Sequence, residues 1–289
     1  MAGQFLQHIR SAIANLNPAE VRQTAERPVA IGLVASSSAA FAVMEDYFSP
    51  AALSRAKRYE TTGALHRVGD PGVPTEFDIE IWEEGLPGPP ESVSFSPRNP
   101  ERAVKEILDR RQELGLPLAR QLYPFRQPVV DRVIQTISRE NALFALVTAL
   151  PDIMPSMLEI PWFVGEFATD TGFLTVNQVR MAFLIAAASD RPVGYREQRS
   201  QIASIITAAF GWRALARELA GKIPFGAGLI PKAAIAYAGT YVVGLSLDRM
   251  YRIGYGYTRS ERRLAYESAL ERGKELAGRL LGGIRKPAS

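Results

Sequence analysis

The stretch from Lys222 to Leu247, "KIPFGAGLIPKAAIAYAGTYVVGLSL", constrains the fold of this chain most, because Lys232 is its only charge after Lys222. Such an apolar run must either cross a membrane or lie inside protein. A membrane span needs about twenty consecutive apolar residues, and the fully uncharged part, 233–247, is shorter than that. We therefore expect the central helix of a helical bundle and keep a span over 223–247 as the alternative.

Four residues of this helix recur at intervals of four and therefore share one face: Lys232, Ala236, Thr240 and Gly244. A ridge of small side chains lets another backbone approach closely, in water or in lipid. We call Ala236, Thr240 and Gly244 the small-residue ridge. The ridge and Lys232 are candidate interaction residues.

Polar residues also interrupt a second apolar stretch, "TVNQVRMAFLIAAAS". Asn177 and Gln178 are suited to cross-link helices by hydrogen bonds, and Arg180 is a cation available to buried carboxylates. Because buried charges normally pair, we interpret the charges of this half as structural ion pairs. These three residues complete the set of candidate interaction residues.

Three carboxylates recur at intervals of seven in the same half: Asp152, Glu159 and Glu166. A carboxylate metal site is the alternative to ion pairing. Di-iron bundles, however, combine such carboxylates with Glu-x-x-His pairs, and both histidines, His8 and His66, lie in the other half. We therefore assign no metal ligand.

The sequence pattern of the first half differs from that of the second and predicts an α/β segment. "RPVAIGLVA" is typical of a strand and is followed by serines that suit the start of a helix. Two further strands, in "GALHRVG" and "TEFDIEIWEEG", are expected to form a hairpin across the Gly-Asp-Pro-Gly turn. This order is similar to the first half of a P-loop GTPase.

The residues that a phosphate loop needs are absent from that segment. The motif G-x-x-x-x-G-K-[ST] cradles phosphate with backbone amides, neutralises it with Lys and holds magnesium with the hydroxyl. After Gly32, this chain has Ser37, Ser38 and Ala39 at the last three positions, and Trp82 stands where a magnesium-associated Asp is expected. We expect no nucleotide binding and interpret the segment as a degenerate GTPase-like half.

Composition and charge narrow the class of protein further. The 289 residues include no cysteine, which excludes disulfides, zinc thiolate sites and cysteine nucleophiles. The net charge of +4 suits carboxylate, phosphate or lipid headgroup partners without requiring nucleic acid. The N-terminus predicts a short amphipathic helix and lacks the pattern of a secretory signal. We expect a cytoplasmic protein, peripheral at the inner face of the cell membrane.

Three runs of the second half together resemble one known family: "ALPDIMPSMLEIPW", "NQVRMAFLIAAA" and the Gly-rich turn and helix from "GWRALARELAGKIPFGAG" to "DRMYRIGYG". Over about residues 142–256 the chain is similar to the YcjF-like bacterial domain of unknown function 697. That family is often fused or neighbouring to Era-like GTPases, so the resemblance implies a GTPase-associated and membrane-associated context. The family has no established catalytic residues, and the resemblance assigns none here.

The sequence thus predicts an α+β protein that is mostly helical. Residues 1–27 form an amphipathic helix, 28–125 a small α/β domain, and 126–289 a helical bundle with the Gly-rich helix at its centre. We expect a non-catalytic interaction module without cofactor, whose partners are a GTPase, an anionic membrane surface or a second copy of the chain, and not nucleic acid. The alternatives are a divergent nucleotide hydrolase and an integral membrane protein with spans at 142–168 and 223–247.

The last helix, which ends in "GRLLGGIRKPAS", offers a specific contact for the anionic surface. Its cations Arg279, Arg285 and Lys286 are suited to lipid headgroups, where each charge near the surface contributes about 1 kcal/mol.

Overall fold

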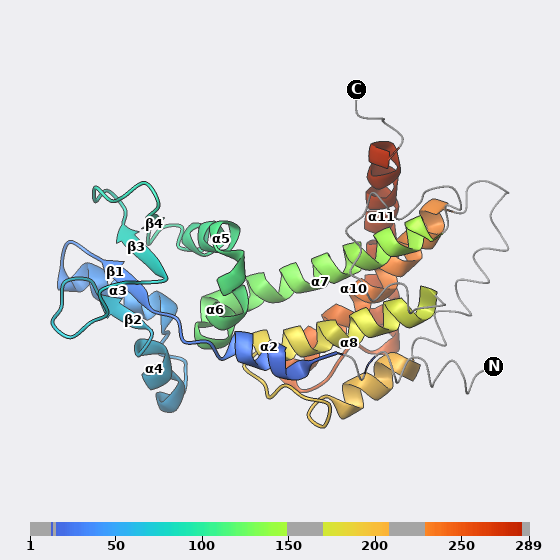
Figure 1. Cartoon of the computed structure of the whole chain (residues 1–289), viewed down its shortest axis with the longest axis horizontal. Coiled ribbons are helices and arrows are strands. Elements are labelled where there is room, and N and C mark those ends of the chain that lie inside the picture. The colour runs from blue at the N-terminus through green and yellow to red at the C-terminus, as the bar shows by residue number, and fades with distance from the viewer. Residues whose placement is uncertain (1–12, 14–15, 149–169, 208–228, 285–289) are drawn as a thin grey trace. The chain divides into compact units, whose positions relative to one another are not determined.

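A computed structural model of the chain describes residues 13, 16–148, 170–207 and 229–284. They fall into two compact units, each described here by itself. The sheet unit comprises Ala19–Asp131 and Ala186–Pro192; the helical unit comprises Met1–Pro18, Arg132–Ile185 and Val193–Ser289. The predicted α+β class with predominant helix is confirmed (Figure 1).

Four short strands form one sheet in the order β2-β1-β3-β4. They are β1 (Ile31–Val34), β2 (Leu65–Arg67), β3 (Ile79–Glu83) and β4 (Val93–Phe95). All neighbouring strands pair in parallel. Ile31 and Leu33 are fully buried, as expected for a strand at the centre of a parallel sheet.

The predicted hairpin between the second and third strands is wrong. β2 and β3 do not pair with each other; both pair in parallel with β1, on opposite edges. The connection 68–78 therefore runs past β1 instead of turning back, and it lies close to the backbone of Gly32. A Cβ at Gly32 would lie 2.8 Å from the Phe77 ring. The hairpin was the feature that made the segment similar to half of a GTPase, so that similarity loses this support.

The helical elements of the sheet unit are α2 (Pro18–Ala25), α3 (Ser38–Phe48), α4 (Arg55–Thr62), α5 (Glu101–Arg110), the 3-10 turn η1 (Gln112–Leu114) and α6 (Gly115–Gln121), of which α3, α4 and α5 pack on the strands. α3 begins where the serines predicted it, since the Ser37 hydroxyl accepts the N–H of Ala40. Phe48 joins the layers: its ring lies 5.9 Å from that of Phe95 and 6.0 Å from that of Phe125. The predicted N-terminal helix falls largely on residues outside the described part.

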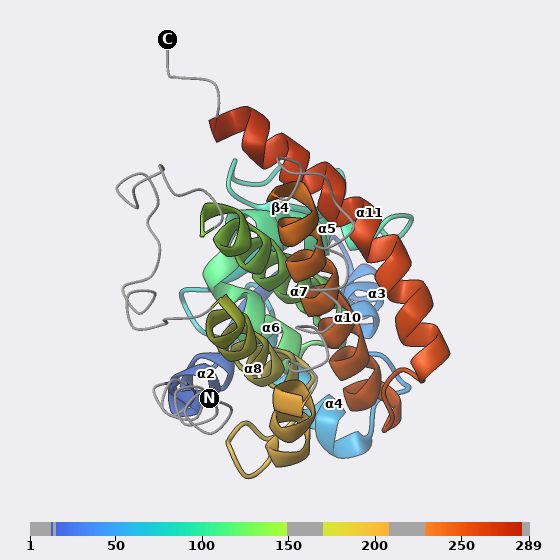
Figure 2. The same ribbon diagram turned by 90° about the vertical axis from the view of Figure 1, so that its right-hand side faces the viewer.

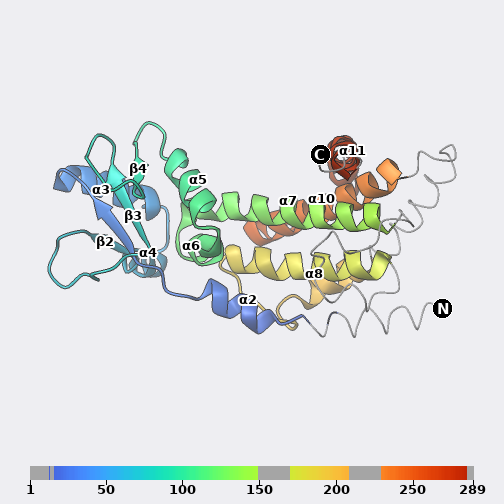
Figure 3. The same cartoon turned by 45° about the horizontal axis from the view of Figure 1, so that its top comes forward.

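The helical unit is built from four long helices: α7 (Tyr123–Val147, which begins in the sheet unit), α8 (Asp170–Ala188, whose last residues belong to the sheet unit), α10 (Leu229–Ile253) and α11 (Arg259–Ile284). α7 and α8 run side by side (Figure 3), and Phe144 stacks on Phe173 with ring centroids 3.9 Å apart. α11 packs on α10 through Gly273, where a Cβ would lie 2.9 Å from the Ala234 backbone.

A short turn joins α10 to α11 (Figure 2). Gly254 ends α10 with φ of +87°, a conformation that side chains disfavour. Thr258 and Glu261 then form a capping box at the start of α11: the Thr258 N–H donates to the Glu261 carboxylate at 2.8 Å, and the Glu261 N–H donates to the Thr258 hydroxyl at 3.4 Å. Arg249 of α10 also binds Glu261, at 2.6 Å, so one carboxylate connects the two helices.

The free energy of unfolding should depend on Glu261 in acid. The hydrogen bond from Arg249, followed by those from Thr258, lowers the pKa of Glu261 to about 2 from 4.5. A carboxylate with a depressed pKa stabilises the folded state above its unfolded pKa, and this contribution is lost as the pH falls through the folded pKa. We expect wild type to exceed Glu261→Gln in stability above about pH 5 and the difference to shrink toward pH 2. Denaturant unfolding of both proteins across that range measures it, and a constant difference would contradict the account.

Candidate functional site

The small-residue ridge lies inside the helical unit. Ala236, Thr240 and Gly244 are all buried. At Gly244 an added Cβ would lie 2.7 Å from Ile134 Cγ1 of α7 and 3.1 Å from Met181 Sδ of α8. The ridge therefore serves as the close-contact face of α10 against two helices of its own unit.

A buried network of hydrogen bonds crosses the three helices beside the ridge. The Thr240 hydroxyl of α10 accepts the amide of Asn141 of α7 at 2.8 Å and the amide of Gln178 of α8 at 3.3 Å. Asn177 of α8 donates to the Asn141 side-chain oxygen at 2.9 Å. Asn177 and Gln178 thus cross-link helices, as their position in an apolar stretch predicted. Sequence reasoning missed Asn141, although its place among apolar residues of α7 is the same kind of signal.

The two candidate cations occupy different environments. Arg180 binds the carboxylate of Glu140 on α7 at 2.8 Å, which agrees with the expected structural ion pair. Lys232 lies at the start of α10, where its ammonium donates to the Thr148 hydroxyl at 3.4 Å. The carboxylates at 152, 159 and 166 lie outside the described residues. Within the described ranges, no group of three or more His, Asp or Glu residues is arranged to hold a metal ion.

Replacing Gly244 tests whether the ridge is packed as described. Gly244→Leu should force α7 and α8 away from α10 and lower the free energy of unfolding by about 1–3 kcal/mol or more through overpacking. Gly278→Leu is the matched control, because Gly278 is an exposed helical residue of α11 with nothing within 4 Å of its added Cβ. This control should be neutral or stabilising by up to about 1 kcal/mol. Denaturant unfolding and size-exclusion chromatography measure the effects, and equal stabilities of the two variants would contradict the packing.

The carboxyl ends of the strands form the second candidate site. Ligands of open parallel sheets bind at this edge, where connections leave in opposite directions from neighbouring strands. Here that point lies between β1 and β3. The Glu83 carboxylate at the end of β3 accepts the N–H of Ser36 at 2.7 Å, in the loop after β1. Hydrogen bonding from the Ser36 side chain and backbone lowers the pKa of Glu83, so the carboxylate is charged at neutral pH.

Backbone N–H groups at this edge already donate hydrogen bonds to side chains of the protein. Two amides that a phosphate loop would offer are occupied, that of Ser36 by Glu83 and that of Ala40 by the Ser37 hydroxyl. Arg67 at the end of β2 donates to the Ser38 hydroxyl at 3.1 Å. A phosphate at the loop would face the negative charge of Glu83. Sequence reasoning missed Glu83, whose position directly after Trp82 at the end of a strand was the available signal.

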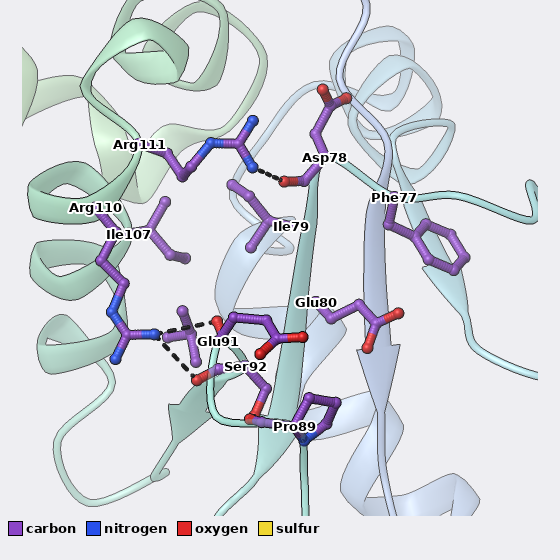
Figure 4. A pocket seen from close by; sticks show the side chains of 11 residues that line it. Phe77, Asp78, Ile79, Glu80, Pro89, Glu91, Ser92, Ile107, Arg110 and Arg111 are labelled. Atoms are coloured by element: carbon purple, nitrogen blue, oxygen red, sulfur yellow. Dashed lines mark hydrogen bonds between the residues drawn. The ribbon is translucent and has the colours of Figure 1, made fainter.

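The sheet unit also has a pocket of about 400 Å³, at the opposite ends of the strands (Figure 4). It lies beside the start of β3 and the C-terminal end of α5. Its two arginines are engaged with backbone carbonyls: Arg110 binds those of Glu91 and Ser92, and Arg111 binds that of Asp78. These contacts anchor the loops that precede β3 and β4. The amino end of a parallel sheet is not where such folds bind ligands, so we assign the pocket no site.

Comparison with known proteins identifies no relative. Family models, curated proteins and solved structures were each searched, and none matches the chain. The resemblance to the YcjF-like domain therefore stays a prediction.

A titration with nucleotide tests whether the carboxyl ends of the strands, where Glu83 lies, bind phosphate. We expect no measurable affinity for GTP or ATP at millimolar magnesium, because the loop lacks its lysine and second glycine and its amides are occupied. Isothermal titration calorimetry of the wild type measures this. Ser37→Gly with Ser38→Lys should not confer hydrolysis either, since the magnesium and base-recognition parts are missing as well. A micromolar dissociation constant for the wild type would overturn the account.

Proposed function

We propose that this protein is a non-catalytic interaction module that works at the surface of an anionic membrane. The observation that carries the proposal is the packing of α10. Residues Ile230–Ile253 are the one described helix that is long and apolar enough to cross a bilayer, yet this helix lies against α7, α8 and α11. More than half of its most apolar stretch, 56%, is buried within the protein.

The polar groups of α10 support a peripheral position rather than an inserted one. Asp248 is buried and bound to Arg252 at 3.0 Å, and Arg249 and Lys232 are also on this helix. Charged residues cost at least a few kcal/mol each at bilayer depth. The buried amides of Asn141 and Gln178 both donate to the Thr240 hydroxyl inside the bundle, and breaking these hydrogen bonds would leave unpaired polar groups.

The non-catalytic part of the proposal rests on the Glu83 edge. A carboxylate holds the loop that a nucleotide would need, since Glu83 accepts the N–H of Ser36. In the alternative, a divergent nucleotide hydrolase, two hydrogen bonds would have to break before these amides could bind phosphate. They are the bond from the Ser36 N–H to Glu83 and the bond from the Ala40 N–H to the Ser37 hydroxyl.

The sequence also predicted a GTPase and a second copy of the chain as partners. Self-assembly was expected through the small-residue ridge, which instead packs on Ile134 and Met181. We therefore assign the ridge to the fold, and the GTPase partner rests on the family resemblance alone. The proposal assigns the protein to the cytoplasm, at the inner leaflet, where the lipids are anionic.

Membrane fractionation tests this proposal. The protein should pellet with membranes at low salt and move to the supernatant in high salt or carbonate, because screening removes a surface charge attraction. Recovery only in detergent would refute a peripheral position and favour spans at 142–168 and 223–247. Recovery in the supernatant at low salt would refute the membrane surface, and co-purification of a GTPase would then favour the partner that the resemblance implies.

A further inference from the structure

Three large apolar side chains are exposed around the turn that joins α10 to α11. Ile253 is 51% exposed, Tyr255 58% and Leu264 68%. Ile253 ends α10, Tyr255 lies in the turn, and Leu264 lies in the second turn of α11. Helical side chains lean toward the helix N-terminus, so Leu264 leans toward the same end of the helix pair. We call these residues and the arginines around them the turn patch.

The turn patch is rich in arginine. Residues 248–267 contain five arginines and three carboxylates. The carboxylates are all engaged: Asp248 with Arg252, Glu261 with Arg249, and Glu267 with Arg263. Arg259 and Arg262 are exposed, and no carboxylate pairs with either among the residues that the structure describes. The patch therefore carries an excess of positive charge.

The positions of these cations are electrostatically unfavourable within the fold. Arg259, Arg262 and Arg263 lie in the first two turns of α11, where the helix dipole favours negative charge. The helix dipole therefore disfavours these three positions, although Arg263 is paired with Glu267 four residues further on. An external anion would compensate the charge that the fold leaves unbalanced.

The turn itself is held in a defined conformation. Arg249 lies over the rings of both Tyr255 and Tyr257, at 5.2 and 5.1 Å from their centroids. The Tyr257 N–H donates to the Ser246 hydroxyl at 3.2 Å, and Gly256 lies against Ser246 so closely that a Cβ would be 2.5 Å from its Oγ. The exposed side chains are thus presented from a fixed turn.

We infer that the turn patch docks on anionic phospholipid headgroups, an inference that rests on the proposed membrane-surface function. Exposed apolar and tyrosine side chains at the end of a helix pair suit the boundary between headgroups and acyl chains, where such residues bury their apolar parts. The free arginines bind lipid phosphates. The contact differs from the one expected at the other end of α11, with Arg279, Arg285 and Lys286, the last two of which lie outside the described residues.

Vesicle co-sedimentation of the full chain tests the inference. The probe is vesicles of phosphatidylcholine with and without phosphatidylglycerol. Each arginine near an anionic surface contributes about 1 kcal/mol, so Arg259→Gln with Arg262→Gln should lower the partition coefficient roughly 30-fold. Arg102→Gln with Lys105→Gln is the matched control, because it makes the same change in net charge at two exposed positions of α5 with the same spacing, and it should lower the partition coefficient by less than about threefold. Both double variants replace exposed residues, and equal or higher melting temperatures confirm that they are folded.

A fluorescent label tests insertion of the apolar side chains separately. The chain has no cysteine, so Leu264→Cys gives a unique site for an environment-sensitive dye, and Glu275→Cys is the control on an exposed position of the same helix. The emission of the dye at 264 should shift to the blue when anionic vesicles are added, and the emission at 275 should not change.

The outcomes separate this inference from the proposed function. Equal losses of binding in the two double variants, or no loss in either, would overturn the turn patch while leaving a membrane-binding protein. No sedimentation of the wild type with anionic vesicles would overturn both. Retention on immobilised polyglutamate but not on vesicles would assign the patch to an acidic protein and overturn the lipid inference.

Discussion

The Thr240 hydroxyl connects the three helices that form the interior of the helical unit. It accepts amides from Asn141 of α7 and Gln178 of α8, and Asn141 in turn accepts from Asn177. A buried polar group must find its partner or cost about 1–3 kcal/mol, so this network permits few alternative registers of α10. Gly244, one turn further along, lies so close to Ile134 that an added Cβ would be 2.7 Å from its side chain.

The same packing determines which residues of α10 are buried and which are exposed to solvent. A helix apolar enough for a bilayer contributes its small residues and its hydroxyl to the interior of a folded unit, and its charged C-terminal part leads to the turn before α11. Exposed apolar groups and exposed arginines gather at that turn. The protein therefore combines a buried apolar helix with a basic surface at its end, and this combination supports the proposed attachment to a membrane surface over insertion.

Interactions between residues close together in the sequence could be predicted from it, whereas contacts between residues far apart along the chain could not. The Ser37 cap depends on residues three apart along the chain, and the serines after the first strand predicted it. The predicted hairpin was wrong because the turn motif at 69–72 shows only that the chain changes direction there. It does not show that β2 and β3 pair with opposite edges of β1 instead of with each other.

The candidate site residues show the same difference between local patterns, which the sequence reveals, and distant contacts, which it does not. Periodicity placed Ala236, Thr240 and Gly244 on one face, and apolar surroundings marked Asn177 and Gln178 as cross-links. The ridge was first interpreted as a candidate interaction surface, since spacing does not show which helix covers it. Asn141 and Glu83 were missed, because each acts on a residue 99 or 47 positions away.

Hydrogen exchange of the full chain in water, without lipid, tests most directly whether α10 is a core helix. The account predicts that backbone amides of residues 236–248 are among the slowest to exchange, and that they remain so when anionic vesicles are added. Fast exchange of these amides in water, with protection only in the presence of lipid, would show that the helix is completed by the bilayer and would contradict the account.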